Sequence, residues 1–92
     1  LHGILMAPHG TFDGLIGLAA LVQVSAAMPQ NLIAFEYPIG DPAWWYDIVD
    51  GLPDDIVKNG QIEVWDRPGL GVDIIPEAAK PYLPEGDEDF FD

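Results

Sequence analysis

Two short apolar runs, residues 4–7 and 32–35, stand on either side of a longer apolar segment, residues 14–28. The short runs lack polar alternation, which is typical of strands buried on both faces of a parallel sheet. The long segment repeats apolar residues at helical spacing, and either Thr11 or Asp13 can cap it. Strand, helix and strand within about 35 residues form a βαβ unit, whose two strands run parallel. The sequence therefore predicts part of an α/β fold.

Beyond the second strand, the patterns change to short elements. Asp41 and Pro42 are typical of a helix cap and a first-turn proline, which predicts a short helix over residues 43–49 with Gly51 near its end. The rest of the chain predicts, in order, a Gly/Pro loop, a short apolar run, one helical turn and an acidic tail: residues 67–71, 72–75, 76–82 and 84–92.

Asn59 and Gly60 give the clearest local signal in the chain. This dipeptide is typical of a two-residue hairpin turn of the primed type, in which both residues have positive φ. The expected arms of the hairpin are residues 55–58 and 61–65.

The chain is strongly acidic. Of its 92 residues, 16 are Asp or Glu and three are Lys or Arg, which gives a formal net charge of -13. Nucleic acid and anionic membranes are excluded as partners, because binding them needs clustered Lys and Arg. The acidic excess indicates a well-hydrated surface or, alternatively, a host with high internal salt. The chain has no cysteine, which excludes disulfides and thiolate metal sites and fits a cytoplasmic protein.

A single βαβ unit is expected to be a piece of a larger domain. Two buried parallel strands cannot close a core alone, and the apolar helix needs more covering than 92 residues provide. The chain also opens in mid-pattern without Met. Its longest weakly polar run, residues 14–29, is too short for a membrane span.

His9 and Glu36 are the candidate active-site residues. Each stands at the C-terminal end of its expected strand, two positions after an alanine. In parallel α/β barrels that end carries the active site, with residues contributed by several strands, so we expect both side chains to face one cavity. The alternative is that His9 has a structural role. A structural role fits Glu36 less well, because an unpaired carboxylate after four apolar residues is costly to bury. His2 lies at the opposite end and receives no role.

Trp44 is a secondary candidate for substrate binding. It belongs to an aromatic cluster, residues 44–46, that could stack on a sugar, although aromatics in a short helix usually pack against the body of a domain. The many aspartates show no ligand spacing, so no metal ligand is predicted within the chain.

The order of four short motifs resembles the mandelate racemase subgroup of the enolase superfamily. The motifs are Met-Ala-Pro-His, Pro-Gln-Asn, Phe-Glu and Trp-Asp-Arg-Pro-Gly-Leu-Gly-Val, at residues 6–9, 29–31, 35–36 and 65–72. The resemblance implies a C-terminal fragment of a modified (β/α)8 TIM-type barrel. Residues 1–50 would be its last βαβα portion. Residues 51–92 would be a C-terminal hairpin, loop and tail that return toward a capping domain.

In function, the resemblance implies a Mg²⁺-dependent dehydratase of sugar acids (aldonates or aldarates), inactive as this fragment alone. His9 would act as general base or acid beside the substrate carboxylate. Glu36 would be protonated, which burial favours, and would hydrogen-bond the developing oxyanion. The metal ligands and the aspartate that orients His9 are expected outside this chain, in a homo-oligomeric enzyme. A racemase, epimerase or cycloisomerase of the same superfamily is the alternative, as is a non-catalytic acidic interaction module.

The hairpin generates a first testable prediction. Replacing Gly60 with Val in the full-length protein should lower the free energy of unfolding by about 1 kcal/mol or more, because a β-branched residue disfavours positive φ. Thermal or denaturant unfolding measures the change, and an unaltered midpoint would remove the turn assignment.

Overall fold

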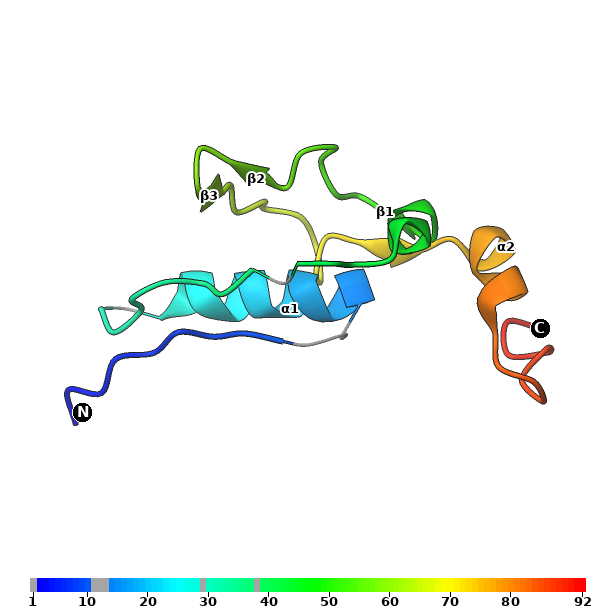
Figure 1. Ribbon diagram of the computed structural model, residues 1–92, viewed down its shortest axis with the longest axis horizontal. Helices are drawn as coiled ribbons and strands as arrows, with labels where there is room; N and C mark the ends of the chain where they lie inside the picture. Colours follow the sequence, from blue (N-terminus) through cyan, green and yellow to red (C-terminus); the bar gives the residue numbers. More distant parts are fainter. Residues whose placement is uncertain (1, 11–13, 29, 38) are drawn as a thin grey trace.

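The computed structural model describes residues 2–10, 14–28, 30–37 and 39–92. The molecule is elongated, 47 × 28 × 26 Å, with its termini at opposite ends (Figure 1). Its elements in chain order are the helices and strands α1 (Gly14–Ala27), η1 (Ala43–Asp47), β1 (Val49–Asp50), β2 (Val57–Lys58), β3 (Gln61–Ile62), β4 (Asp73–Ile74), α2 (Pro76–Ala79) and η2 (Lys80–Tyr82).

Helix α1 is the longest element and confirms the helix predicted over residues 14–28. Its buried residues recur at helical spacing along one face: Leu15, Leu18, Ala19, Val22 and Ser25. The helix contains no charged residue, and Val24 on another face is 54% exposed. An apolar helix without a charged face is typical of one buried inside a larger protein. The expected caps Thr11 and Asp13 lie outside the described residues.

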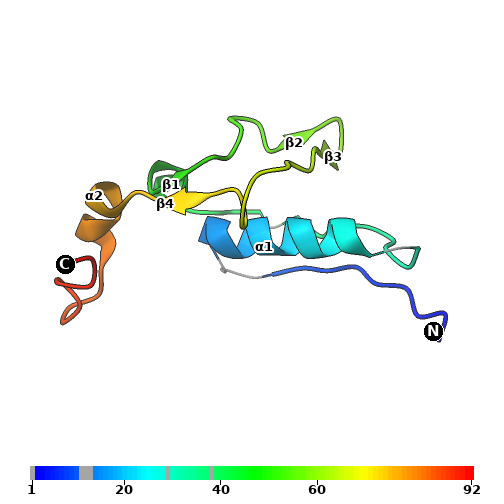
Figure 2. The same cartoon turned by 180° about the vertical axis from the view of Figure 1, so that it is seen from behind.

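The two apolar runs pair in parallel, as predicted. Met6 and Leu32 form a parallel bridge. The Met6 amide donates to the Asn31 carbonyl (2.7 Å), and the Ile33 amide donates to the Met6 carbonyl (2.9 Å). The pairing consists of isolated bridges rather than a continuous ladder. Both segments run alongside α1, as the two opposite views show (Figures 1 and 2).

The prediction that these runs are buried on both faces is not met within this chain. Ile4, Leu5 and Ile33 are 65%, 60% and 63% exposed. Helix α1 covers one side of the paired segments, and no described element covers these three side chains. The paired segments therefore present an apolar surface that the described residues leave open to solvent.

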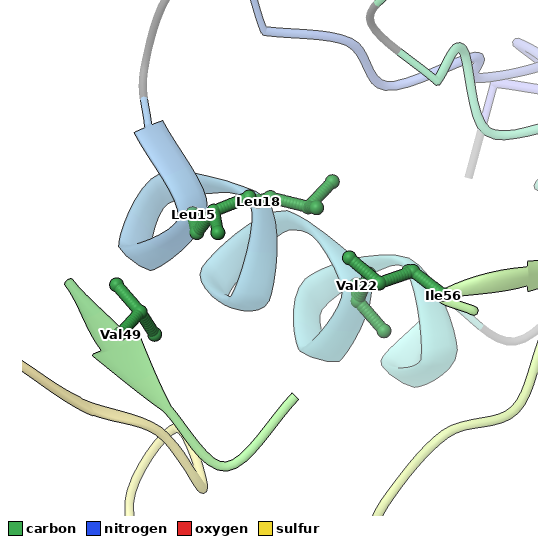
Figure 3. Close-up of a cluster of buried hydrophobic side chains, with 5 residues drawn as sticks. All are labelled: Leu15, Leu18, Val22, Val49 and Ile56. Atoms are coloured by element: carbon green, nitrogen blue, oxygen red, sulfur yellow. The ribbon is translucent and has the colours of Figure 1, made fainter. Parts of the chain in front are cut away.

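The core lies between α1 and the segments that follow it in the chain. Leu15, Leu18 and Val22 of α1 form a cluster with Val49 of β1 and Ile56, which precedes β2 (Figure 3). Full burial of such a side chain contributes about 1.5–3 kcal/mol. Partly buried residues pack around this cluster: Ile16, Phe35, Tyr37, Trp45, Ile48, Leu52, Ile62, Trp65 and Val72. Helix α1 thus holds both the second apolar run and the C-terminal half of the chain.

The short helix predicted to begin at Ala43 is present, but its cap and its end differ from the prediction. The structure has a 3-10 helix, η1, whose N-cap is Pro42 rather than Asp41. The Trp45 amide donates to the Pro42 carbonyl (3.1 Å), an i to i+3 bond that sets the tighter helix. The helix ends at Asp47 because the next residues enter a strand.

That strand, β1, pairs with β4 in an antiparallel sheet that the sequence did not predict. Val49 lies opposite Ile74, and the Ile75 amide donates to the Ile48 carbonyl (2.8 Å). The predicted apolar run at residues 72–75 therefore returns to the residues that follow η1. This pairing links residues 1–50 to residues 51–92.

The predicted hairpin is confirmed. Strands β2 and β3 pair antiparallel around Asn59 and Gly60, which have φ of 53° and 72° as the primed turn requires. Its arms are shorter than expected, since each strand contributes two residues to the ladder.

The Gly/Pro loop is fastened to the rest of the molecule through Trp65. The Trp65 indole N–H donates to the Leu70 carbonyl (2.6 Å), and the Gln23 side chain of α1 donates to the Trp65 carbonyl (3.2 Å). The Arg67 guanidinium donates to the Gly51 carbonyl. Gly71 has φ of 75°, and a Cβ added there would lie 2.5 Å from the indole ring. The loop therefore requires glycine both for its backbone and for the space that Trp65 fills.

The C-terminal segment confirms the helical turn predicted within residues 76–82, which divides into α2 and η2. The Lys80 ammonium lies 3.4 Å from both Glu77 and Asp92, and the Glu77 charge, followed by Asp92, raises the pKa of Lys80. These are exposed ion pairs, so they add little to stability.

The packing of Gly71 against Trp65 gives the second prediction. Gly71→Ala should lower the free energy of unfolding by about 2–4 kcal/mol, since it adds a steric overlap to a strained backbone. Gly69→Ala is the matched control: φ is 62° there, but nothing lies within 4 Å of an added Cβ, so we expect a loss of only about 1 kcal/mol. Denaturant unfolding of the full-length protein compares the two variants. Equal losses would show that the indole contact does not restrict Gly71.

Candidate active site

His9 and Glu36 lie side by side at the ends of the two parallel segments. They form a parallel bridge, and the Glu36 amide donates to the Pro8 carbonyl (2.9 Å). Residues paired in this way stand level and carry their side chains on the same face. The structure therefore brings together the two residues that the sequence singled out.

The register of the two segments changes between their two bridges. His9 is three positions after Met6, whereas Glu36 is four positions after Leu32. With a constant register, Phe35, three positions after Leu32, would lie opposite His9. Glu36 would then point to the other face, because a slip of one residue exchanges the two faces. One extra residue in the second segment, as in a β-bulge, brings Glu36 level with His9 instead.

This register differs from the sequence expectation in one respect. The sequence predicts Ala7 and Ala34 as corresponding positions, each two residues before its candidate. In the structure Met6, rather than Leu5 or Ala7, is level with Leu32. The pairing of the two candidate residues holds because of the extra residue and not because the two strands alternate in step.

Glu36 is exposed, while Phe35 and Tyr37 on either side of it are partly buried against the core around α1. Side chains alternate along an extended segment, so Glu36 points away from α1. His9 is also exposed. The expected burial of Glu36 is therefore not provided by the described residues, because none of them covers that face.

Two hydroxyl groups connect the residue after Glu36 to η1. The Tyr46 hydroxyl donates to Asp41 Oδ2 (3.5 Å), and the Tyr37 hydroxyl lies 3.4 Å from that of Tyr46. Burial, together with the hydrogen bond to Tyr46 and the Asp41 charge, raises the pKa of Tyr37 well above its usual range. From the sequence, Tyr46 stood out only as a member of the aromatic cluster at residues 44–46, and Tyr37 and Asp41 received no role at the site. The signal that could have pointed to Tyr37 is the aromatic residue on each side of Glu36.

Trp44 stacks on Tyr82, with ring centroids 4.2 Å apart and planes 8° from parallel, and meets Trp45 edge to face at 6.3 Å. It also lines an open cavity of about 280 Å³ beside the start of α1, with Leu15 and Ile74 among its neighbours. One face of the indole is thus occupied by Tyr82, which fits the packing alternative. Sugar stacking by Trp44 stays a prediction.

Within the described ranges, His, Asp and Glu form no group of three that could hold a metal ion. The described residues therefore do not by themselves make a Mg²⁺ site. In the same part of the chain, no helix has the length and apolar character needed to cross a bilayer.

Comparison with known proteins identifies the family. The model of the enolase C-terminal domain-like family matches residues 1–78. The chain therefore belongs to this family, as the order of its motifs predicted, and its two parallel segments joined by α1 are in keeping with the α/β class.

Among curated proteins, the chain is similar to D-xylonate dehydratase of Haloferax volcanii. The two are 40% identical over 92 residues, which is 100% of this chain and 21% of the relative. The chain thus spans about a fifth of the relative's length. No solved structure matches the chain.

Proposed function

We propose that this chain is part of a sugar-acid dehydratase that removes the proton beside a substrate carboxylate. The observation that carries the proposal is the parallel bridge between His9 and Glu36, which sets an imidazole and a carboxyl group level on one exposed face. The similarity to D-xylonate dehydratase along the whole chain favours dehydration over racemisation, epimerisation or cycloisomerisation. Membership of the enolase-like family likewise favours an enzyme over an acidic interaction module.

The proposed place of the chain is the end of a TIM-type barrel. Residues 1–50 would supply the last two parallel strands with α1 between them, and residues 51–92 would form the extension toward a capping domain. The exposed apolar side chains of Ile4, Leu5 and Ile33 support this placement, because neighbouring barrel strands would cover them. In a barrel, the end of the strands that carries His9 and Glu36 is the catalytic end.

His9 would transfer the proton. An imidazole titrates near neutral pH, so it can take the proton beside the carboxylate or deliver one to the departing hydroxyl. Glu36, in its protonated form, would donate a hydrogen bond to the oxygen on which negative charge develops. Because Glu36 is exposed here, its protonation would require covering by the part of the enzyme outside this chain.

The remaining parts of the proposal follow from the family rather than from the geometry of this chain. Mg²⁺, held by residues outside the chain, would stabilise negative charge on the substrate carboxylate. The substrate would be an aldonate or aldarate, and the enzyme a cytoplasmic homo-oligomer. Nucleic acid and anionic membranes would not be partners, because a net charge of -13 disfavours binding to negatively charged surfaces.

The third prediction tests the pair in the full-length enzyme with Mg²⁺ and D-xylonate or another aldonate. His9→Asn should lower kcat by about 10²-fold or more, the usual scale for general acid–base catalysis. Glu36→Gln should lower kcat by a smaller factor, because the amide can still donate a hydrogen bond. Steady-state kinetics, with a melting curve for each variant, separates loss of chemistry from loss of folding.

Two exposed residues of the same types serve as controls. His2→Asn and Glu63→Gln change exposed residues that lie outside the bridge, and both should keep kcat within about twofold of wild type. If a folded His9→Asn enzyme turns over within a few-fold of wild type, His9 does not transfer the proton and the structural alternative is correct.

A further inference from the structure

Glu36 stands on an irregular piece of backbone. Two isolated bridges hold the segment from Leu32 to Glu36, and the register changes between them. A regular ladder would fix each residue through its neighbours, but here the last backbone bond before the loop is the Glu36 amide on the Pro8 carbonyl (2.9 Å). The position of the Glu36 carboxyl group therefore depends on what fixes the residue that follows it.

Tyr37 is that residue, and its hydroxyl is held by η1. The Tyr46 hydroxyl donates to Asp41, and a phenol has only one proton to donate. Tyr37 must therefore be the donor in its bond with Tyr46. The hydrogen bonds therefore run in one direction, from Tyr37 to Tyr46 (3.4 Å) and from Tyr46 to the Asp41 carboxylate (3.5 Å); both are long and exposed.

Helix η1, which carries Tyr46, is itself packed against α1. Trp45, the residue before Tyr46, packs against the cluster that contains Leu15, Leu18 and Val22 of α1. Tyr37 packs against the same cluster. The two hydroxyl groups thus join two segments that rest on one helix, and they close the loop that begins directly after Glu36.

We propose that Tyr46 is a positioning residue for Glu36. By bonding both Tyr37 and Asp41, it fixes the loop after Glu36 and so keeps the Glu36 carboxyl group level with His9. This inference rests on the proposed function of Glu36 and assigns Tyr46 no contact with the substrate.

The fourth prediction is a double-mutant test in the full-length enzyme with Mg²⁺ and D-xylonate. Tyr46→Phe keeps the ring and removes both hydrogen bonds, so kcat should fall by about three- to tenfold with a smaller change in KM. In an enzyme that already carries Glu36→Ala, which leaves no side chain to position, the same change should leave kcat within about twofold, because residues that act through one another are not additive. Tyr37→Phe, which leaves the bond between Tyr46 and Asp41 in place, should show the same dependence on Glu36.

Tyr82→Phe is the matched control. It removes a hydroxyl group that lies outside this chain of hydrogen bonds and keeps the ring that stacks on Trp44, so kcat should be unchanged in both backgrounds. Melting curves accompany each variant, and Tyr37→Phe decides the question if Tyr46→Phe does not fold.

Each remaining outcome is decisive. If both Tyr variants keep wild-type kcat, or lower it by the same factor with and without Glu36→Ala, Tyr46 does not act through Glu36 and the inference is wrong. In that case the proposed function stands, provided that Glu36→Gln alone lowers kcat. If Glu36→Gln alone has wild-type kcat, both the proposed catalytic role of Glu36 and the inference about Tyr46 are wrong.

Discussion

Burial of the apolar face of α1 is the interaction on which the rest of the structure depends. Leu15, Leu18 and Val22 supply most of the buried cluster, and Val49 and Ile56 reach it from segments far along the chain. Removing such side chains from water is worth about 25 cal/mol per Å² of apolar area. The other described elements have at most five residues each, too few to be stable unless they pack on a larger surface. The helix is thus the surface on which they are arranged.

The candidate site follows from that packing. Phe35 and Tyr37 face the α1 cluster, so Glu36 between them faces the other way. The extra residue in its segment then places it level with His9. The same cluster supports Trp45 and therefore η1, whose Tyr46 holds Tyr37. The geometry of the two candidate residues is therefore an indirect result of how an apolar helix is covered.

The C-terminal half shows which features the local sequence predicts and which depend on packing. The glycines of the loop after Trp65 predicted a turn, but only the packed structure shows that Gly71 leaves room for the indole and that Gly51 approaches the Gly71 carbonyl. The apolar side chains left exposed on residues 4–6 and on Ile33 agree with a chain that spans 21% of its relative. Such a surface is typical of one that contacts further protein.

The sequence by itself determined the elements whose signals lie within a few residues. These are α1, the hairpin turn at Asn59 and Gly60, the parallel direction of the two apolar runs, and the placing of His9 and Glu36 at their ends. Only the tertiary structure decided the pairing of β1 with β4, the 3-10 form of η1, the register change before Glu36 and the hydrogen bonds of Tyr46. The reason is physical. Helix periodicity and turn geometry depend on neighbouring residues, whereas register and strand pairing depend on which distant side chains compete for the same apolar surface.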